Sequence, residues 1–300
     1  MRAYLQLLRL PNVFTAMADI MLGFLVTHAR LEPVGQFLLL LTSSSALYLA
    51  GMALNDYCDR RQDADERPFR PIPSGRVSQQ AAWRIGVGLL VGGVLLAMVA
   101  ATAAFHARPA IVALLLAAAV LAYDCGLKRT PLGPLAMGAC RTLNVLLGMS
   151  LSIDPWQAVH WVIAAGIGVY IVGLTLFARS EAHVSSRPRL AAALVVLLSG
   201  LGLLASLPVW ITGEEWPPIQ LPERWYLFWV VLAMLVGGRM ARAVANPQPA
   251  QVQQAVRGAI FALVVVDAGA CLAVHDRLWA LAILALLAPT LLLGRWLYST

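Results

Sequence analysis

The chain has 300 residues, of which 60% are hydrophobic and only 12% are charged, and its mean hydropathy is +0.76. Soluble domains carry about 25% charged residues, so this composition excludes a water-soluble globule. The net charge of +7 comes from 22 basic and 15 acidic residues, which is too sparse a set of charges for a nucleic-acid-binding domain. The composition is typical of a protein embedded in lipid.

Ten apolar runs, separated by polar residues, are long enough to cross a bilayer. A hydrocarbon core about 30 Å thick needs roughly 20 apolar residues per helix. We therefore expect an all-α, multi-pass transmembrane bundle of nine or ten helices, folded as one domain over residues 1–300. The expected spans are 11–29, 34–54, 79–104, 109–124, 131–151, 158–178, 189–208, 225–243, 253–273 and 278–297.

Basic residues gather on one side of these spans and predict the orientation of the chain. By the positive-inside rule, the side with more Lys and Arg is cytoplasmic. Ten crossings would place both ends of the chain on that side. We expect an integral protein of the bacterial inner membrane, with its functional site facing the cytosol. Seventeen of the 22 basic residues lie on this side: Arg2, Arg9, Arg60, Arg61, Arg67, Arg70, Arg76, Arg84, Lys128, Arg129, Arg179, Arg187, Arg189, Arg239, Arg242, Arg257 and Arg295.

An acidic run lies at the cytoplasmic end of the second span. Asn55, Asp59 and Asp63 have spacings that stack them along one slowly drifting helix face, with Asp56 beside them, so that their oxygens point at one site. Like charges this close repel one another unless a cation lies among them. Oxygen ligands without His or thiolate suit Mg²⁺, which shares its shell with substrate phosphates. The run therefore predicts a Mg²⁺ site; the alternative is a solvated helix end with intrahelical Asp–Arg pairs.

The stretch after the acidic run supplies positive charge. It reads Arg67-Pro68-Phe69-Arg70-Pro71-Ile72-Pro73-Ser74-Gly75-Arg76. Its Pro and Gly residues end the helix and keep guanidinium groups near the acids. A metal ion combined with arginine is a natural receptor for a diphosphate.

These residues resemble the UbiA superfamily of intramembrane prenyltransferases. The family pattern NDxxDxxxD is met by Asn55, Asp56, Asp59 and Asp63, the pattern RPxxxG by Arg70, Pro71 and Gly75, and the YxxxLKR segment by residues 123–129. The resemblance implies a helical bundle around a lipid-open central cavity. It also implies that Mg²⁺ holds the diphosphate of a polyprenyl diphosphate while the prenyl group passes to an aromatic or other small acceptor within the membrane.

The resemblance also gives individual residues a role. It implies that Asn55, Asp59 and Asp63 are Mg²⁺ ligands, and that Asp56 is a ligand or a supporting acid. The catalytic acids it suggests are Asp56, Asp59, Asp63 and Glu181, and the diphosphate contacts are Arg67, Arg70, Lys128 and Arg129.

The chain departs from the family at the second aspartate motif. Active members carry a DxxxD pattern at the end of the sixth helix, whereas residues 175–183 contain Glu181 as their only carboxylate. Glu181 and His183 would then complete one shared site, or Arg179 would replace the charge of a metal ion; the alternative is that these are ordinary polar residues at the membrane interface. This pattern resembles the UbiA-like branch of ebo-type biosynthetic clusters. The rival hypothesis is a non-catalytic protein that binds or carries an isoprenoid or other lipid diphosphate.

Polar residues inside the spans form a second group of candidates. An unpaired Arg within the bilayer costs roughly 3 kcal/mol, so Arg141 should face the bundle interior with a partner. Asn144 lies one turn further along the same face. We expect both to line the cavity and contact the substrate, and pairing between helices is the alternative. For Asp19 and Asp267 we expect helix pairing.

Overall fold

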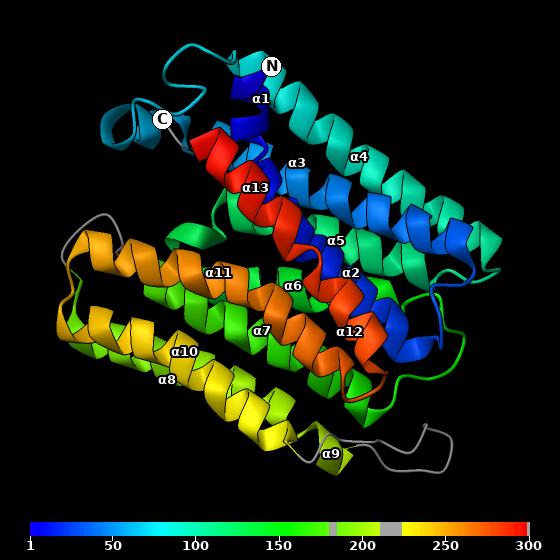
Figure 1. The fold of residues 1–300 in the computed structure, drawn as a ribbon. Coiled ribbons are helices and arrows are strands. Elements are labelled where there is room, and N and C mark those ends of the chain that lie inside the picture. The colour runs from blue at the N-terminus through cyan, green and yellow to red at the C-terminus, as the bar shows by residue number, and fades with distance from the viewer. Residues whose placement is uncertain (180–184, 211–223, 299–300) are drawn as a thin grey trace.

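The computed structural model describes residues 1–179, 185–210 and 224–298, and every regular element in these ranges is a helix (Figure 1). The order is α1 (Arg2–Leu7), η1 (Leu10–Asn12), α2 (Val13–Thr27), α3 (Val34–Glu66), α4 (Gln79–Ala103), α5 (Arg108–Cys125), η2 (Leu127–Arg129), α6 (Gly133–Met149), α7 (Ala158–Ala178), α8 (Arg187–Ala205), α9 (Leu207–Trp210), α10 (Trp225–Ala245), α11 (Pro249–Cys271), α12 (Arg277–Leu284) and α13 (Leu287–Tyr298).

Nine stretches of the described chain are long and apolar enough to cross a membrane, and α12 and α13 together form the last of them. The 17-residue α6 is not among these nine, but it also runs from one end of the bundle to the other. The N–H of its first residue, Gly133, donates to Thr130 O beside η2. Leu151 O, just beyond its last turn, lies 3.1 Å from His106 Nε2 in the connection between α4 and α5. With or without α6, the described helices agree with the prediction of nine or ten passes.

The two ends of the chain lie next to each other. Arg2 Nη2 donates to Trp296 O, and Gln6 Nε2 donates to Leu297 O, each over 3.0 Å. Figure 1 shows the two termini at the same end of the bundle.

The predicted span 34–54 covers only the lipid-crossing part of its helix. Helix α3 continues to Glu66 and has 33 residues, a length of about 50 Å at 1.5 Å per residue. That exceeds the hydrocarbon thickness of about 30 Å, so its last turns extend past the apolar layer. The acidic run therefore lies within the helix, and Pro68 follows directly after the helix end.

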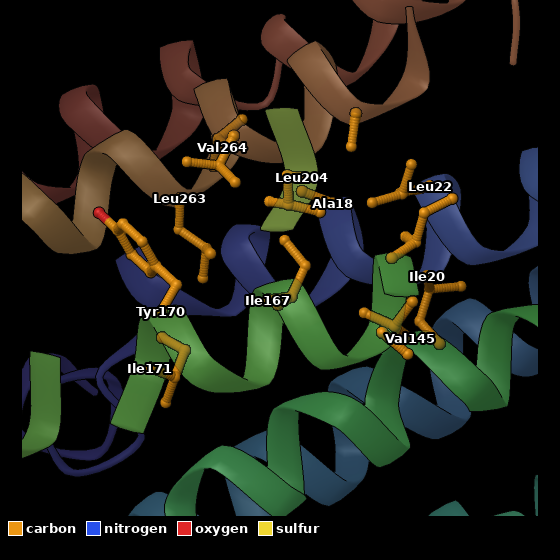
Figure 2. Close-up of a cluster of buried hydrophobic side chains, with 14 of the residues drawn as sticks. Ala18, Ile20, Leu22, Val145, Ile167, Tyr170, Ile171, Leu204, Leu263 and Val264 are labelled. Atoms are coloured by element: carbon orange, nitrogen blue, oxygen red, sulfur yellow. The ribbon is translucent and has the colours of Figure 1, made fainter. Parts of the chain in front are cut away.

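The bundle has an inner and an outer set of helices. In the most apolar 18-residue stretch of each helix, the buried share of residues is 72% for the first span (Leu10–Thr27) and 61% for α11. The same share is only 28% for α4 and for α10. Figure 2 shows the core formed by the inner helices, where Ile20 of α2, Val145 of α6 and Leu263 of α11 are fully buried. The outer helices leave apolar side chains for lipid, and the inner helices surround the cavity described next.

Candidate active site

A cavity of about 660 Å³ lies among α2, α3, α5, α6, α7 and α11. The end nearest the termini is lined by charged residues of α3, η2 and the segment after α3. Apolar side chains also line the cavity: Leu47, Leu116, Val120, Met137, Ile171, Leu174, Val256 and Ile260. The inner end is polar again, with Ser44, Tyr48, Arg141 and Asn144. The cavity can therefore hold a molecule with a charged head and an apolar body.

The acidic run on α3 divides between two directions. Each residue of a helix turns the side-chain direction by about 100°. Relative to Asn55, Asp59 is turned by about 40°, Asp63 by about 80° and Asp56 by about 100°. Asn55 and Asp59 line the cavity, whereas Asp56 and Asp63 do not. The expectation that all of these side chains point at one site is wrong, because the small rotation per four residues accumulates along the helix.

Asp56 and Asp63 are buried against arginine instead. Arg70 Nη1 lies 2.6 Å from Asp63 Oδ2 and 3.3 Å from Asp56 Oδ1, and Arg9 Nη2 lies 3.1 Å from Asp56 Oδ1. The alternative to a metal site was that the acids of this run pair with arginines of the same helix. Asp56 and Asp63 do pair with arginine, but their partners Arg9 and Arg70 lie outside α3. The pairs fasten η1 and the segment after α3 to the helix, while Arg70 also lines the cavity.

Asp124 on α5 is a cavity residue that the sequence analysis missed. Asn55 Nδ2 donates to Asp124 Oδ1 over 2.9 Å, and both residues line the cavity with Asp59. Its position in the 123–129 segment, four residues before Lys128, could have identified it as a site residue from the sequence. Oxygen donors of this kind suit Mg²⁺. No three His, Cys, Asp or Glu side chains in the described part of the chain form a complete metal site, so an ion here would need ligand or water oxygens as well.

Basic residues face these acids from the other side of the cavity mouth. Lys128 Nζ lies 2.8 Å from Asp59 Oδ2, and Arg129 Nη2 lies 3.4 Å from Asp59 Oδ1. Arg67 also lines the cavity, so all four predicted diphosphate contacts do. Arg179, which the sequence suggested as a replacement for a metal's charge, lines it too, and so does Arg9, which sequence reasoning did not select. With six cations around Asp59 and Asp124, the mouth is suited to an anion with several negative charges.

Arg141 and Asn144 form the inner polar end together with Asp19 of α2. Arg141 Nη1 donates to Asp19 Oδ2 over 2.7 Å, and its Nη2 donates to Thr15 Oγ1 over 2.8 Å. Asn144 Nδ2 donates to the same Asp19 oxygen over 2.9 Å. The arginine guanidinium also lies 5.3 Å from the centre of the Tyr48 ring. Arg141 and Asn144 thus both line the cavity and pair α6 with α2.

The second motif is not placed by this structure. Glu181 and His183 lie outside the described residues. The described helix α7 ends at Ala178, and Arg179 beyond it donates to Thr130 O over 2.6 Å.

These features define a multi-pass membrane protein with an acidic and amide oxygen cluster at the mouth of a central cavity that is rich in basic side chains. Residues 16–262 match the model of the UbiA prenyltransferase family. The chain belongs to this family of transferases, and its integral membrane character follows from the family together with the apolar helices.

Relatives with known names resemble parts of the chain. A digeranylgeranylglyceryl phosphate synthase of Methanopyrus kandleri is 38% identical over 161 residues, which are 52% of this chain and 57% of the relative. The synthase of Methanothrix thermoacetophila is 40% identical over 93 residues, 31% of this chain and 35% of the relative. The chain thus matches between a third and somewhat over half of the length of these relatives.

Two solved structures share the fold. One, from work on digeranylgeranylglyceryl phosphate synthase in membranes, has a TM-score of 0.63 at 18% identity and covers 94% of this chain and 98% of the other. A UbiA homologue from Archaeoglobus fulgidus bound to GPP and Mg²⁺ has a TM-score of 0.61 at 13% identity and covers 94% and 99%. The expected UbiA-like helical fold is confirmed.

Proposed function

We propose that the protein is a Mg²⁺-dependent prenyltransferase that takes its prenyl group from a polyprenyl diphosphate. The observation that carries this proposal is the arrangement of Asn55, Asp59 and Asp124 in one cavity with Lys128 and Arg129. Apolar side chains such as Leu116, Ile171 and Leu174 line the same cavity, and this lining suits an isoprenoid chain.

Asn55, Asp59 and Asp124 are the residues that would hold Mg²⁺, since their hard oxygen donors fit that ion and leave positions for phosphate oxygens. When bound, the ion supplies positive charge that stabilises the departing diphosphate. The description of the Archaeoglobus fulgidus homologue with GPP and Mg²⁺ supports this choice of ion. In this proposal Asp56 and Asp63 act through Arg70, and Glu181 remains a predicted catalytic acid.

The protein's own groups perform the remaining work. Lys128, Arg129, Arg67 and Arg70 bind the diphosphate and stabilise the charge that develops on it as the carbon–oxygen bond breaks. The apolar lining excludes water, which protects the allylic cation from hydrolysis. The oxygen of the acceptor hydroxyl then bonds to the allylic carbon, and the hydroxyl proton passes to the released diphosphate.

We infer that the acceptor is a glycerophosphate lipid with a free hydroxyl group. The names of the archaeal relatives support this class over the aromatic acceptor expected from the sequence. Arg9 and Arg179 add positive charge to the mouth beyond the four diphosphate contacts, and a second phosphate would use it. The basic residues at this end support a cytosolic cavity mouth; the bacterial inner membrane stays a prediction.

A transfer assay tests this function against the carrier alternative. The purified protein in lipid nanodiscs receives labelled geranylgeranyl diphosphate and Mg²⁺, with geranylgeranylglyceryl phosphate, para-hydroxybenzoate or no acceptor. We expect diphosphate release and labelled lipid with the glycerophosphate, and none after chelation of Mg²⁺. The matched control Asp65→Asn, an exposed acid of α3 outside the cavity, should keep full activity. Labelled para-hydroxybenzoate instead would overturn the acceptor class, and Mg²⁺-dependent binding without diphosphate release would establish the carrier.

A further inference from the structure

Two fully buried carboxyl groups lie behind the inner end of the cavity. Asp19 of α2 and Asp267 of α11 have 0% exposure, α2 packs directly against α11, and the two carboxyl groups interact with each other. Asp19 Oδ2 accepts from Arg141 and Asn144. Asp19 Oδ1 and both oxygens of Asp267 have no donor among the described residues. Two ionised carboxylates cannot bond to each other, and leaving three such oxygens buried without donors costs several kcal/mol or more.

One proton between the two carboxyl groups removes this conflict. A protonated Asp267 donates its O–H to Asp19 Oδ1 and supplies the missing donor. The cluster of Asp19, Asp267 and Arg141 is then electrically neutral, whereas two ionised acids beside one arginine would leave a net negative charge in a low-dielectric interior. Adjacent carboxyl groups share a proton for this reason.

The contacts show which acid keeps its charge. Asp19 accepts from two donors of α6, while Asp267 has neither a cation nor an amide bonded to it. The Tyr170 hydroxyl of α7 donates to Ala259 O over 2.8 Å, so it does not serve Asp267. Ionised Asp19 is therefore the counterion of Arg141, and Asp267 is its neutral hydrogen-bond donor.

This arrangement fixes Arg141 at the inner end of the cavity. Two of the five N–H donors of a guanidinium are used by Asp19 and Thr15. The side chain is 12% exposed and lines the cavity beside Tyr48 and Asn144. Tyr48 precedes Asp59 by 11 positions on α3, which is about 16 Å along the helix axis. Because a prenyl chain has no oxygen, donors at this depth suit a polar group of a second ligand.

We propose that Asp19 and Asp267 share one proton and thereby position Arg141 as a hydrogen-bond donor to an oxygen of the prenyl acceptor. Asp19 and Asp267 are positioning residues, since neither lines the cavity. The acceptor contact rests on the proposed function, but the shared proton does not.

Infrared spectroscopy tests the proton without any substrate. Asp267→Asn keeps the shape of the side chain and offers an N–H donor to Asp19. At neutral pH the wild-type protein in nanodiscs should show a carboxylic-acid C=O band that is absent from Asp267→Asn. Identical spectra in this region would overturn the proposal, as would failure of Asp267→Asn to fold, because a neutral donor should be accepted at that position.

Steady-state kinetics test the positioning role with geranylgeranylglyceryl phosphate as the acceptor probe. Asp19→Asn should raise the acceptor KM by about tenfold or more and change the KM for geranylgeranyl diphosphate by less than about twofold. Asp267→Asn should leave both constants within about threefold of wild type. Equal damage from the two variants would contradict the assignment of charge to Asp19. If the wild type transfers nothing, the proposed function fails, and the infrared band still decides the proton.

Discussion

Asp59→Ala should lower kcat/KM for a prenyl diphosphate by about 10³-fold or more. Asp59 is the acid of the α3 run that faces the cavity, and it contacts both Lys128 and Arg129. Its loss removes a proposed metal ligand and the counterion that orients two diphosphate contacts. Steady-state kinetics measure the effect, and thermal unfolding in detergent should show a fold close to wild type, since the side chain is at the edge of the cavity.

Asp63→Asn is the matched comparison on the same helix. Asp63 lies outside the cavity and bonds to Arg70 at 2.6 Å. Its replacement should reduce activity by only about tenfold, through the displaced arginine, and should lower the unfolding temperature because a buried ion pair is broken. Equal losses of activity at the two positions would contradict the division of the acidic run described above.

Asp19→Leu should lower the free energy of unfolding by about 3 kcal/mol, because it leaves Arg141 buried without its counterion. The variant Asp19→Leu/Arg141→Met should recover most of that loss, since apolar groups of similar volume replace both charges. Chemical unfolding in detergent measures the four free energies of this double-mutant cycle. A double variant no more stable than Asp19→Leu would show that the ion pair is not the source of the effect.

The membrane passes could be predicted from the sequence because every helix crossing lipid must be both apolar and internally hydrogen-bonded. Hydropathy marked only the lipid-crossing part of α3, since the helix continues into water, and the end of the helix was indicated by the Pro and Gly residues that follow it. Glu66 is therefore found at the end of a helix whose predicted span stopped at Leu54.

The site was predicted in part. Helical spacing correctly brought Asn55 and Asp59 to one face, but it did not show that the rotation accumulated by Asp63 would place that side chain outside the cavity, where it pairs with Arg70. The contact between Asn55 and Asp124 joins residues 69 positions apart. Such pairings depend on how α3 and α5 pack, and periodicity within one helix contains no information about them.

The central claim is that a divalent ion and a diphosphate bind at the mouth of the cavity. Anomalous X-ray scattering from Mn²⁺ locates the ion in crystals grown with a non-cleavable thiolodiphosphate analogue of the prenyl donor. We expect a peak within ligand distance of Asp59 and of Asn55 or Asp124, with the diphosphate against Lys128 and Arg129. A peak between Asp56 and Asp63, or a bound analogue without any metal peak, would contradict the account.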